Sequence, residues 1–195
     1  MAQARRARPN PEDARLLPAA RPDSPLAILV MGVSGCGKST LGGLVAEALR
    51  CPFLEGDDFH SREAVAKMRS GQPLNDDDRW PWLDRLGAAT AQAIAAQGAA
   101  VTVCSALRRC YRDRLRAMIG SPVQLVFLEN SRARLRERLA ARAGHFMPLS
   151  LLDSQLATLE RPLAEEDALA LVTEEPPALL RDRVLARLEA RRLTA

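Results

Sequence analysis

Lysine, histidine and aromatic residues are scarce in this sequence, and each shortage excludes a class of protein. Only Lys38 and Lys67 are lysines, although the chain carries 28 basic residues. The two histidines and four cysteines form no Cys-x-x-Cys pair and no zinc-like spacing, which excludes a metal cage of Cys and His. Aromatic residues make up 4% of the chain and the formal net charge is +4. A nucleic-acid binder, which needs stacking aromatics and a strongly basic surface, is therefore not expected.

Long hydrophobic runs are missing as well. No apolar run approaches the roughly 18 residues of a membrane-spanning helix, and the longest, residues 26–31, has the length of a buried strand. No apolar segment follows the N-terminal arginines, so a secretory signal is not expected. Because the cysteines show no paired spacing, the sequence predicts reduced thiols in a cytoplasmic protein without a membrane partner.

The chain divides into a short tail and one domain. Residues 1–24 combine arginines and prolines without apolar periodicity, which predicts a flexible tail ahead of a domain over 25–195. Apolar runs that predict strands occur at residues 26–31, 52–55, 100–104, 123–128 and 168–172. Helical patterns occur at residues 38–50, 61–70, 82–97, 110–119, 131–143, 149–161 and 177–192. This alternation predicts a three-layer α/β fold, a parallel five-stranded sheet with helices on both faces.

Residues 32–39, Gly-Val-Ser-Gly-Cys-Gly-Lys-Ser, match the phosphate-loop pattern G-x-x-x-x-G-K-[ST] at every fixed position. Glycines let the backbone curl around a phosphate with its N–H groups pointing inward, and the helix that follows adds a positive end. Lys38 is expected to reach the β- and γ-phosphates of ATP, and the Ser39 hydroxyl to bind Mg²⁺. The expected nucleotide-binding residues of this segment are Gly32, Val33, Ser34, Gly35, Cys36, Gly37, Lys38, Ser39 and Thr40.

The remaining motifs favour a small-molecule kinase over other phosphate-loop proteins. None of the three asparagines begins the N-K-x-D motif of a GTPase. A motor or AAA-type ATPase would end an apolar strand with paired acids, but residues 100–104 run into Ser105-Ala106 and residues 123–128 into the single Glu129. What remains is a compact kinase that phosphorylates a small hydroxyl compound.

Two polar clusters are candidates for the acceptor site. Asp57 follows the second predicted strand, at the end where ligands bind in parallel sheets, and could take the proton of the attacking hydroxyl. A helix cap is the alternative for Asp57, and a packing role is as plausible for His60. Residues 75–79, Asn-Asp-Asp-Asp-Arg, suit a polyhydroxylated acid, with Arg79 pairing a carboxylate. A solvated turn before a helix starting near Pro81 explains them equally well.

Residues 131–148 are expected to form a lid. Arg134, Arg138 and Arg142 recur every four residues, which puts like charges on one stripe of a helix. An anion such as the transferring phosphoryl group would stabilise that stripe, and a closed lid would exclude water. The alternative is a solvated basic face.

The residues now described resemble the gluconokinase family of small phosphate-loop carbohydrate kinases, over about residues 26–176. The resemblance rests on the phosphate loop, Gly56-Asp57 with His60, and Lys67-Met68. Pro73-Leu-Asn-Asp-Asp-Asp-Arg79 with Pro81-Trp82-Leu83 is its most distinctive part. Cys104-Ser-Ala-Leu-Arg-Arg-Cys-Tyr-Arg-Asp113, Gly144-His145-Phe146 and residues 152–155 complete it.

The resemblance implies transfer of the ATP γ-phosphate to the 6-hydroxyl of D-gluconate with Mg²⁺, an adenylate-kinase-like fold with a lid, and a homodimer. It places the acceptor among Asp57, His60, Asp78, Arg79 and Arg112, and it places Arg138 and Arg142 near the phosphates. Lys38, Asp57 and Arg138 are the expected catalytic residues. Two alternatives stay open on the residues alone: a kinase for another small acid such as shikimate, and a nucleotide-binding regulator without turnover.

Overall fold

The computed structural model describes residues 24–141 and 149–193. The predicted tail therefore lies outside the described residues, apart from Ser24. So does the part of the predicted lid that contains Arg142 and Gly144.

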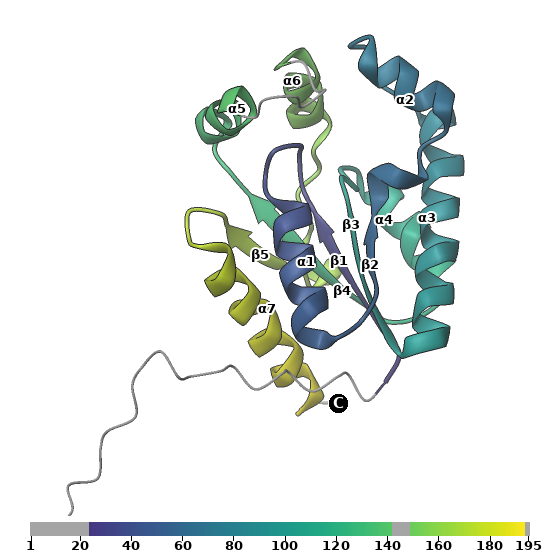
Figure 1. Ribbon diagram of the computed structural model, residues 1–195, viewed down its shortest axis with the longest axis vertical. Coiled ribbons are helices and arrows are strands. Elements are labelled where there is room, and N and C mark those ends of the chain that lie inside the picture. Colours follow the sequence, from purple (N-terminus) through teal and green to yellow (C-terminus); the bar gives the residue numbers. More distant parts are fainter. Residues whose placement is uncertain (1–23, 142–148, 194–195) are drawn as a thin grey trace, which may run out of the picture.

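The centre of the molecule is a five-stranded sheet in which every pair of neighbouring strands is parallel (Figure 1). Its strands are β1 (Leu26–Met31), β2 (Phe53–Glu55), β3 (Ala99–Cys104), β4 (Val123–Glu129) and β5 (Leu169–Val172). Their order is β2-β3-β1-β4-β5, so β1 lies in the middle between β3 and β4. The predicted α/β class and the five predicted strands are confirmed, within one or two residues at each end.

Helices and short 3-10 turns connect the strands. The helices are α1 (Lys38–Leu49), α2 (Arg62–Arg69), α3 (Asp76–Gln97), α4 (Arg109–Ile119), α5 (Arg132–Ala141), α6 (Leu149–Thr158) and α7 (Pro177–Arg192). The 3-10 turns are η2 (Gly56–Phe59) and η3 (Ala164–Glu166). None of the helices within 24–141 and 149–193 has the length and apolar character that crossing a bilayer requires.

Both faces of the sheet are buried, which explains why its central strands are almost continuously apolar. On one face, Ile28 and Val30 of β1 pack in a cluster with residues of α1 and α7. On the other, Leu29 and Met31 pack in a cluster with residues of α3 and α4. Alternate residues of one strand thus supply both cores, and the three-layer arrangement follows.

The start of α3 corrects a prediction. A helix beginning near Pro81 was expected, but α3 begins at Asp76, so Pro81 lies inside it. The Asn75 side chain accepts the N–H of Asp78, and the Asp78 carboxylate accepts the N–H of Asn75. Pro81 has no N–H and leaves one backbone hydrogen bond of the helix unmade. The capping box and the three acids in the first turn stabilise the extra turn and offset this loss.

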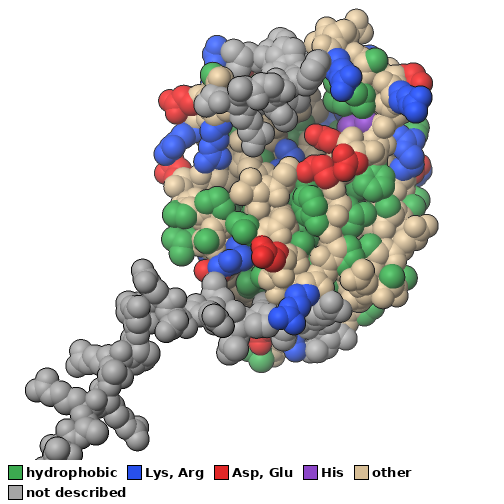
Figure 2. Space-filling model, in the orientation of Figure 1, with side chains coloured by type: hydrophobic (Ala, Val, Ile, Leu, Met, Phe, Trp, Pro, Cys, Tyr) green, Lys and Arg blue, Asp and Glu red, His purple; other side chains and the backbone are tan. Residues whose placement is uncertain are grey.

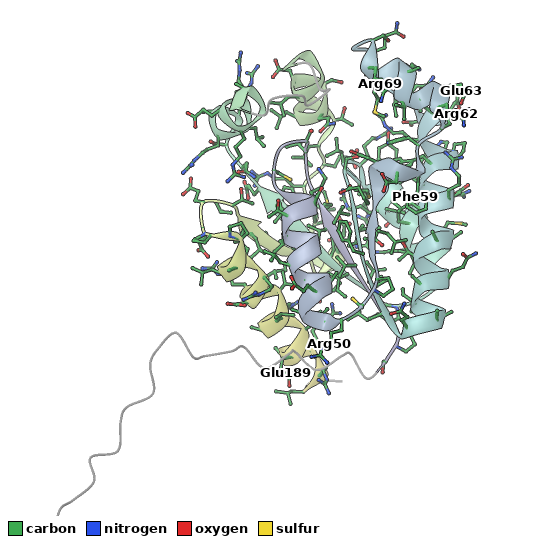
Figure 3. All side chains as sticks on the ribbon, viewed as in Figure 1. Arg50, Phe59, Arg62, Glu63, Arg69 and Glu189 are labelled. Atoms are coloured by element: carbon green, nitrogen blue, oxygen red, sulfur yellow. The ribbon has the colours of Figure 1, made fainter. Side chains whose placement is uncertain are left out.

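Three helices, α2, α5 and α6, lie beyond the carboxyl ends of the strands, around the phosphate loop (Figure 1). Arg62, Glu63 and Arg69 are exposed and stand on the outside of α2 (Figure 3). On the face shown in Figure 2, acidic side chains gather beside a hollow in this upper part of the molecule. The functional site is therefore sought at this end of the sheet.

Two adjacent glycines of α1 should respond oppositely to alanine. A methyl group on Gly42 would lie 2.4 Å from Val103 Cγ1 and 2.9 Å from Phe53 Cε2, whereas one on Gly43 meets nothing within 4 Å. We expect Gly42→Ala to lower the free energy of unfolding by about 1–3 kcal/mol, because α1 must move off the sheet. Gly43→Ala should raise it by up to about 1 kcal/mol, the usual helical gain over glycine. Urea unfolding measures both, and equal effects would contradict the packing described here.

Candidate active site

Residues 32–39 form a phosphate-binding loop between β1 and α1. Gly32, Gly35 and Gly37 have φ angles of 143°, 80° and 100°, which side chains rarely tolerate. A methyl group on Gly32 would lie 2.8 Å from the carbonyl oxygen of Leu128, so the loop also needs glycine for space. Lys38 Nζ donates to the Val33 carbonyl at 3.1 Å across the loop. The lysine amine is thus held over the backbone turn that a phosphate would occupy.

The side chains of Ser39 and Glu55 place oxygen atoms beside the loop that could serve as ligands of a metal ion. Ser39 is exposed in the first turn of α1, and its hydroxyl lies near the Glu55 carboxylate at the end of β2. Burial raises the pKa of Glu55, while the nearby Ser39 hydroxyl and the charge of Lys38 act in the opposite direction. Oxygen ligands of this kind suit Mg²⁺. The described residues contain no group of three His, Cys, Asp or Glu side chains that could hold a metal without other ligands.

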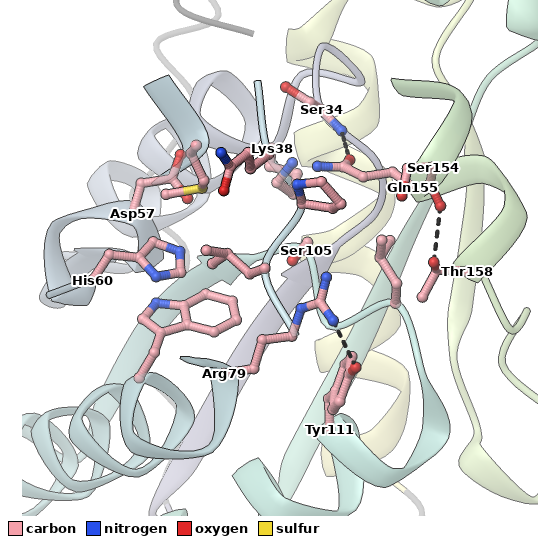
Figure 4. Close-up of a pocket in the computed structure, with 16 residues that line it drawn as sticks. Ser34, Lys38, Asp57, His60, Arg79, Ser105, Tyr111, Ser154, Gln155 and Thr158 are labelled. Carbon is pink, nitrogen blue, oxygen red and sulfur yellow. Dashed lines mark hydrogen bonds between the residues drawn. The ribbon is translucent and has the colours of Figure 1, made fainter. Parts of the chain in front are cut away.

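A cavity of about 110 Å³ opens next to the loop and brings most of the predicted acceptor residues together (Figure 4). Lys38, Asp57 and His60 line one side, and Arg79 and Tyr111 line another. The remaining lining residues are Ser34, Met68, Gln72, Pro73, Leu74, Trp82, Ser105, Leu107, Ser154, Gln155 and Thr158. Its lining includes both apolar and hydrogen-bonding groups, as a small polar ligand requires.

Asp57 is positioned by the turn η2 and by Trp82 beneath it. Trp82 donates its indole N–H to the Gly56 carbonyl at 2.7 Å, and the His60 ring stacks on the indole at 4.3 Å between centroids. Gly56 has no room for a side chain, because a methyl group would lie 2.5 Å from the Val103 carbonyl oxygen. Burial lowers the pKa of His60, and its Nδ1 atom is buried without a hydrogen-bond partner among the described residues.

Arg79 is held by a hydrogen-bonded group that crosses from α3 to α4. Its guanidinium donates to the Tyr111 hydroxyl at 3.1 Å, and that hydroxyl donates to Asp76 at 2.5 Å. Arg108 donates to the other oxygen of Asp76 at 2.9 Å. The hydrogen bond from Tyr111 is the main cause of the lowered pKa of Asp76. These contacts fix the direction in which Arg79 faces the cavity.

Asp78 does not line the cavity. Besides capping α3, its carboxylate accepts from Lys67 Nζ at 2.6 Å, which ties α2 to α3. The Lys67 hydrogen bond is also the main cause of the lowered pKa of Asp78. The polar cluster at 75–79 thus splits: Arg79 faces the cavity, and Asn75, Asp76 and Asp78 organise its wall.

Arg112 lies inside the protein and not in the cavity, where the resemblance had placed it. Its side chain is 1% exposed and makes a two-pronged ion pair with Glu166 at 2.6 and 2.7 Å. It also donates to the carbonyls of Ala106, Leu107 and Glu160. Since its donors are turned inward, Arg112 is in no position to contact an acceptor in this structure. Instead it fixes the backbone next to Leu107, which lines the cavity.

The ion pair of Arg112 and Glu166 should make stability depend on pH. The Arg112 hydrogen bond lowers the pKa of Glu166 from 4.5 to about 2. A depressed carboxyl pKa stabilises the fold above about pH 4.5, and this stabilisation is lost as the pH falls toward 2. At pH 7 we expect Glu166→Gln to lower the free energy of unfolding by about 3 kcal/mol, because Arg112 is left buried and unpaired. At pH 3.5 the difference in free energy of unfolding between wild type and this variant should be smaller by about 1 kcal/mol.

Urea unfolding of both proteins at the two pH values measures this gap. Asp113→Asn is the control, since Asp113 is an exposed partner of Arg109 and Arg116 and should change stability little. A gap of equal size at pH 7 and pH 3.5 would contradict the assignment.

Arg138 approaches the phosphate loop from α5. A methyl group on Gly37 would lie 3.9 Å from its Nη1 atom, and its guanidinium donates to the carbonyl and hydroxyl of Thr173. It lines a second cavity, of about 320 Å³, together with Gly35, Cys36, Gly37, Thr40, Leu41, Leu128, Thr173, Glu175, Pro177 and Leu180. This cavity continues from the loop toward α7, where the rest of a nucleotide could lie. Arg134 is exposed, and Arg142 lies outside the described residues.

Several residues of the site were not singled out from sequence. Tyr111, Trp82 and Gln155 line the cavity, and Glu55 lies beside Ser39. Tyr111, Trp82 and Gln155 fall inside the stretches that carried the family resemblance, and that resemblance was the feature of the sequence that could have indicated them. Gln155 accepts the N–H of Ser34 at 2.7 Å, a contact between residues 121 positions apart that no local pattern could have indicated.

Three comparisons place the chain among known proteins. A family model described as an AAA domain matches residues 28–162, from β1 to beyond α6. A gluconokinase of Gluconobacter oxydans is 42% identical over 166 residues, covering 85% of this chain and 93% of that protein. The crystal structure of a gluconokinase from Sinorhizobium meliloti 1021 superimposes with a TM-score of 0.75 at 47% identity, over 85% of this chain and 93% of that one.

A second solved structure agrees with the two gluconokinase matches. An unliganded sugar kinase structure from a Janibacter species has a TM-score of 0.77 at 43% identity, covering 84% of this chain and 94% of that chain. The domain description alone is broad, and the sequence has no paired acids of a hydrolysing ATPase at the ends of β3 and β4. The relatives narrow it, because they match nearly their whole length. On these grounds the chain belongs to the gluconokinase family.

Proposed function

We propose that this protein transfers the γ-phosphoryl group of ATP to the 6-hydroxyl of D-gluconate, giving 6-phospho-D-gluconate and ADP. The observation that carries the proposal is the cavity in which Lys38 of the phosphate loop, Asp57 and Arg79 meet. An acceptor there would have an anion-binding arginine at one end and the phosphate donor at the other. The gluconokinases that resemble this chain over nearly their full length support the choice of acceptor.

The acceptor end of the cavity suits a sugar acid. Arg79 presents a planar fork that can bind a carboxylate through two hydrogen bonds, and Tyr111 and Asp76 keep it oriented. Ser105, Gln72 and Thr158 supply neutral hydrogen-bonding groups for hydroxyls along the wall. His60 offers one more, through the ring that Trp82 holds by stacking. Binding at both ends would hold the 6-hydroxyl near Asp57.

The donor end suits the phosphates of ATP. Backbone N–H groups of residues 33–39 and the Lys38 amine would bind the β- and γ-phosphates, and Arg138 would stabilise charge on the transferring group. Mg²⁺, held through Ser39 with Glu55 beside it, would neutralise phosphate charge when bound. Asp57 would accept the hydrogen bond, and then the proton, of the attacking hydroxyl.

Asp78 and Arg112 would support the acceptor site indirectly. Asp78 joins α2 to α3 through Lys67, and α2 leads into the stretch Gln72–Leu74 that lines the cavity. Arg112 holds the backbone of Ala106 and Leu107. Their predicted direct contacts with gluconate thus become, in this proposal, contacts that keep the walls in place.

An acceptor panel tests the function. ADP release is measured with Mg-ATP and gluconate, related sugar acids, free sugars or shikimate. We expect strong turnover with gluconate and little with the others. Turnover on another acceptor alone would retain the kinase and contradict the choice of gluconate. ATP binding without turnover on any acceptor would favour a nucleotide-binding regulator.

We also propose that the protein acts as a homodimer in the cytoplasm, as the family resemblance implies, and that residues 131–148 serve as its lid. The four cysteines are free, with Cys36 and Cys104 buried, which suits a reducing compartment. Sedimentation equilibrium at several protein concentrations would measure the assembly state. A mass of one chain throughout would contradict the dimer.

A further inference from the structure

Asn130 and Thr173 lie next to each other at the end of the sheet that carries the phosphate loop. Asn130 directly follows β4, and Thr173 directly follows β5. Because β4 pairs with β1 on one side and with β5 on the other, both residues end strands close to the one from which the loop begins. The Thr173 N–H donates to the Glu129 carbonyl at 3.2 Å, which fixes its backbone to β4. Thr173 is 4% exposed and lines the second cavity with Arg138.

A chain of hydrogen bonds runs through these two side chains from Arg138 to the phosphate loop. Arg138 Nη1 donates to the Thr173 hydroxyl at 3.2 Å, and that hydroxyl donates to Asn130 Oδ1. Asn130 Nδ2 lies 3.5 Å from the carbonyl oxygen of Cys36, at the long end of hydrogen bonding. A guanidinium only donates and a carbonyl only accepts, so both ends of the chain require the same direction. The Thr173 hydroxyl thus gives its proton to Asn130 and keeps its lone pairs for Arg138.

Thr173 holds the guanidinium of Arg138 at two points. Besides accepting Nη1 on its hydroxyl, it accepts Nη2 on its backbone carbonyl at 2.8 Å. Two such contacts fix the plane of a guanidinium as well as its distance. The same Nη1 atom lies 3.9 Å from where a methyl group on Gly37 would be, so the guanidinium stands against the phosphate loop. An arginine has five N–H groups, and those that Thr173 does not take can donate to phosphate oxygens.

We propose that Thr173, supported by Asn130, is a positioning residue that orients Arg138 for phosphoryl transfer before ATP binds. The inference rests on the proposed function, in which Arg138 stabilises charge on the transferring group. Donors that are already in place when charge develops stabilise it more than donors that must first be ordered. An arginine side chain has many conformations, and without the Thr173 hydroxyl it would keep only the contact with the backbone carbonyl. Thr173 therefore acts on the rate through Arg138.

Steady-state kinetics of Thr173→Val tests this role. Valine keeps the branched shape of threonine and its backbone carbonyl but has no hydroxyl. We expect kcat with Mg-ATP and gluconate to fall about 10-fold, because a small misplacement of a catalytic group slows the chemical step. Both KM values should stay within about 2-fold of wild type, since the lost interaction acts mainly in the transition state. Thr173→Ser restores the hydroxyl and should recover most of the lost kcat.

Thr90→Val is the matched control. Thr90 is also buried, and its hydroxyl forms hydrogen bonds of 2.8 Å with the Leu86 carbonyl and the Thr102 hydroxyl, between α3 and β3. The same substitution there removes a buried hydroxyl away from the site, so it should lower Tm and leave kcat unchanged. If Thr90→Val lost as much kcat as Thr173→Val, the effect would be one of general stability and the positioning role would be overturned.

A double-mutant cycle identifies the residue through which Thr173 acts. Arg138→Met removes the guanidinium, so adding Thr173→Val to it should lower kcat by less than about 2-fold. Asn130→Leu, which removes the acceptor of the Thr173 hydroxyl, should lower kcat in wild type and have as little further effect in Arg138→Met. Losses that simply multiply would show that Thr173 acts independently of Arg138, and they would overturn the inference.

A binding measurement separates this inference from the proposed function. Mg-ADP is titrated into the protein with and without aluminium fluoride, which takes the place of the transferring group. We expect the gain in affinity with fluoride to be about 10-fold smaller in Thr173→Val than in wild type, with equal affinity for Mg-ADP alone. An unchanged gain would overturn the positioning role, and so would weaker binding of Mg-ADP alone, which would make Thr173 a nucleotide contact. Wild type that turns over no acceptor would contradict the proposed function, while the titration would still decide the role of Thr173.

Discussion

Replacing Lys38 by alanine is expected to lower turnover at least about 1,000-fold and to leave the fold intact. Lys38 is half-buried at the loop, where its amine lies 3.1 Å from the Val33 carbonyl. In that position it would stabilise the negative charge that develops on the transferring phosphoryl group, and such preorganised contacts are the largest contributions to this chemistry. ADP release at saturating Mg-ATP and gluconate measures the loss, and thermal unfolding measures the fold.

Two further variants make the Lys38 result specific. Arg114→Ala also removes one positive charge, but from an exposed pair with Asp84 between α3 and α4, and should turn over normally. Lys38→Arg keeps the charge while replacing a compact ammonium with a planar fork, and we expect it to be nearly as impaired as alanine. Substantial turnover by Lys38→Ala would remove the phosphate-loop assignment altogether.

Asp57→Asn is expected to lower kcat by about 100-fold while gluconate still binds. Asp57 stands in the turn η2 on the same cavity as Lys38, and asparagine keeps its shape and one acceptor oxygen but takes up no proton. The loss of kcat should be smaller than for Lys38→Ala, because a loose, dissociative transition state depends little on removal of the proton from the attacking hydroxyl. Steady-state kinetics with varied gluconate separates kcat from KM.

The neighbouring acid provides the control for Asp57. Asp58 belongs to the same turn and is exposed, but it does not line the cavity. Asp58→Asn should therefore keep kcat within about 2-fold of wild type, as a surface change without contacts to the site. A near-normal kcat for Asp57→Asn would deny Asp57 the role of base, and equal losses in both variants would indicate a general effect of charge at the turn.

The sequence was sufficient for the parts of the molecule that local chemistry determines. Five apolar runs predicted five strands, most clearly β1, β3 and β4, whose residues are buried on both faces of the sheet. The glycines of the phosphate loop have the backbone angles that their pattern requires. The start of α3 was wrong for an equally physical reason. Proline usually marks the first turn of a helix, and here the capping box of Asn75 and Asp78 outweighs that preference.

Which polar residues face the cavity could not be deduced from sequence in the same way. The three aspartates 76–78 and Arg79 are consecutive, and successive residues of a helix point in different directions. Of these four side chains, only that of Arg79 lines the cavity. Arg112 lies in a stretch that resembles a substrate site, yet Glu166, far along the chain, holds it inside the protein. The link between Gln155 and Ser34 likewise depends on tertiary packing, which no periodicity reports.

The strand order has a consequence for how the protein is made. β1 is the first strand to be synthesised, but its two neighbours in the sheet are β3 and β4. Only β2 with β3 and β4 with β5, among the described strands, pair with the strand that follows in the chain. A ribosome must therefore complete residue 129 before β1 has partners on both sides. Until then β1 and the loop after it have β3 as their only strand neighbour among the described residues, so their geometry is incompletely fixed and ATP would stabilise the nascent chain less than the finished fold. The stretch from β1 to β4 is the interval in which a chaperone would have the most to protect.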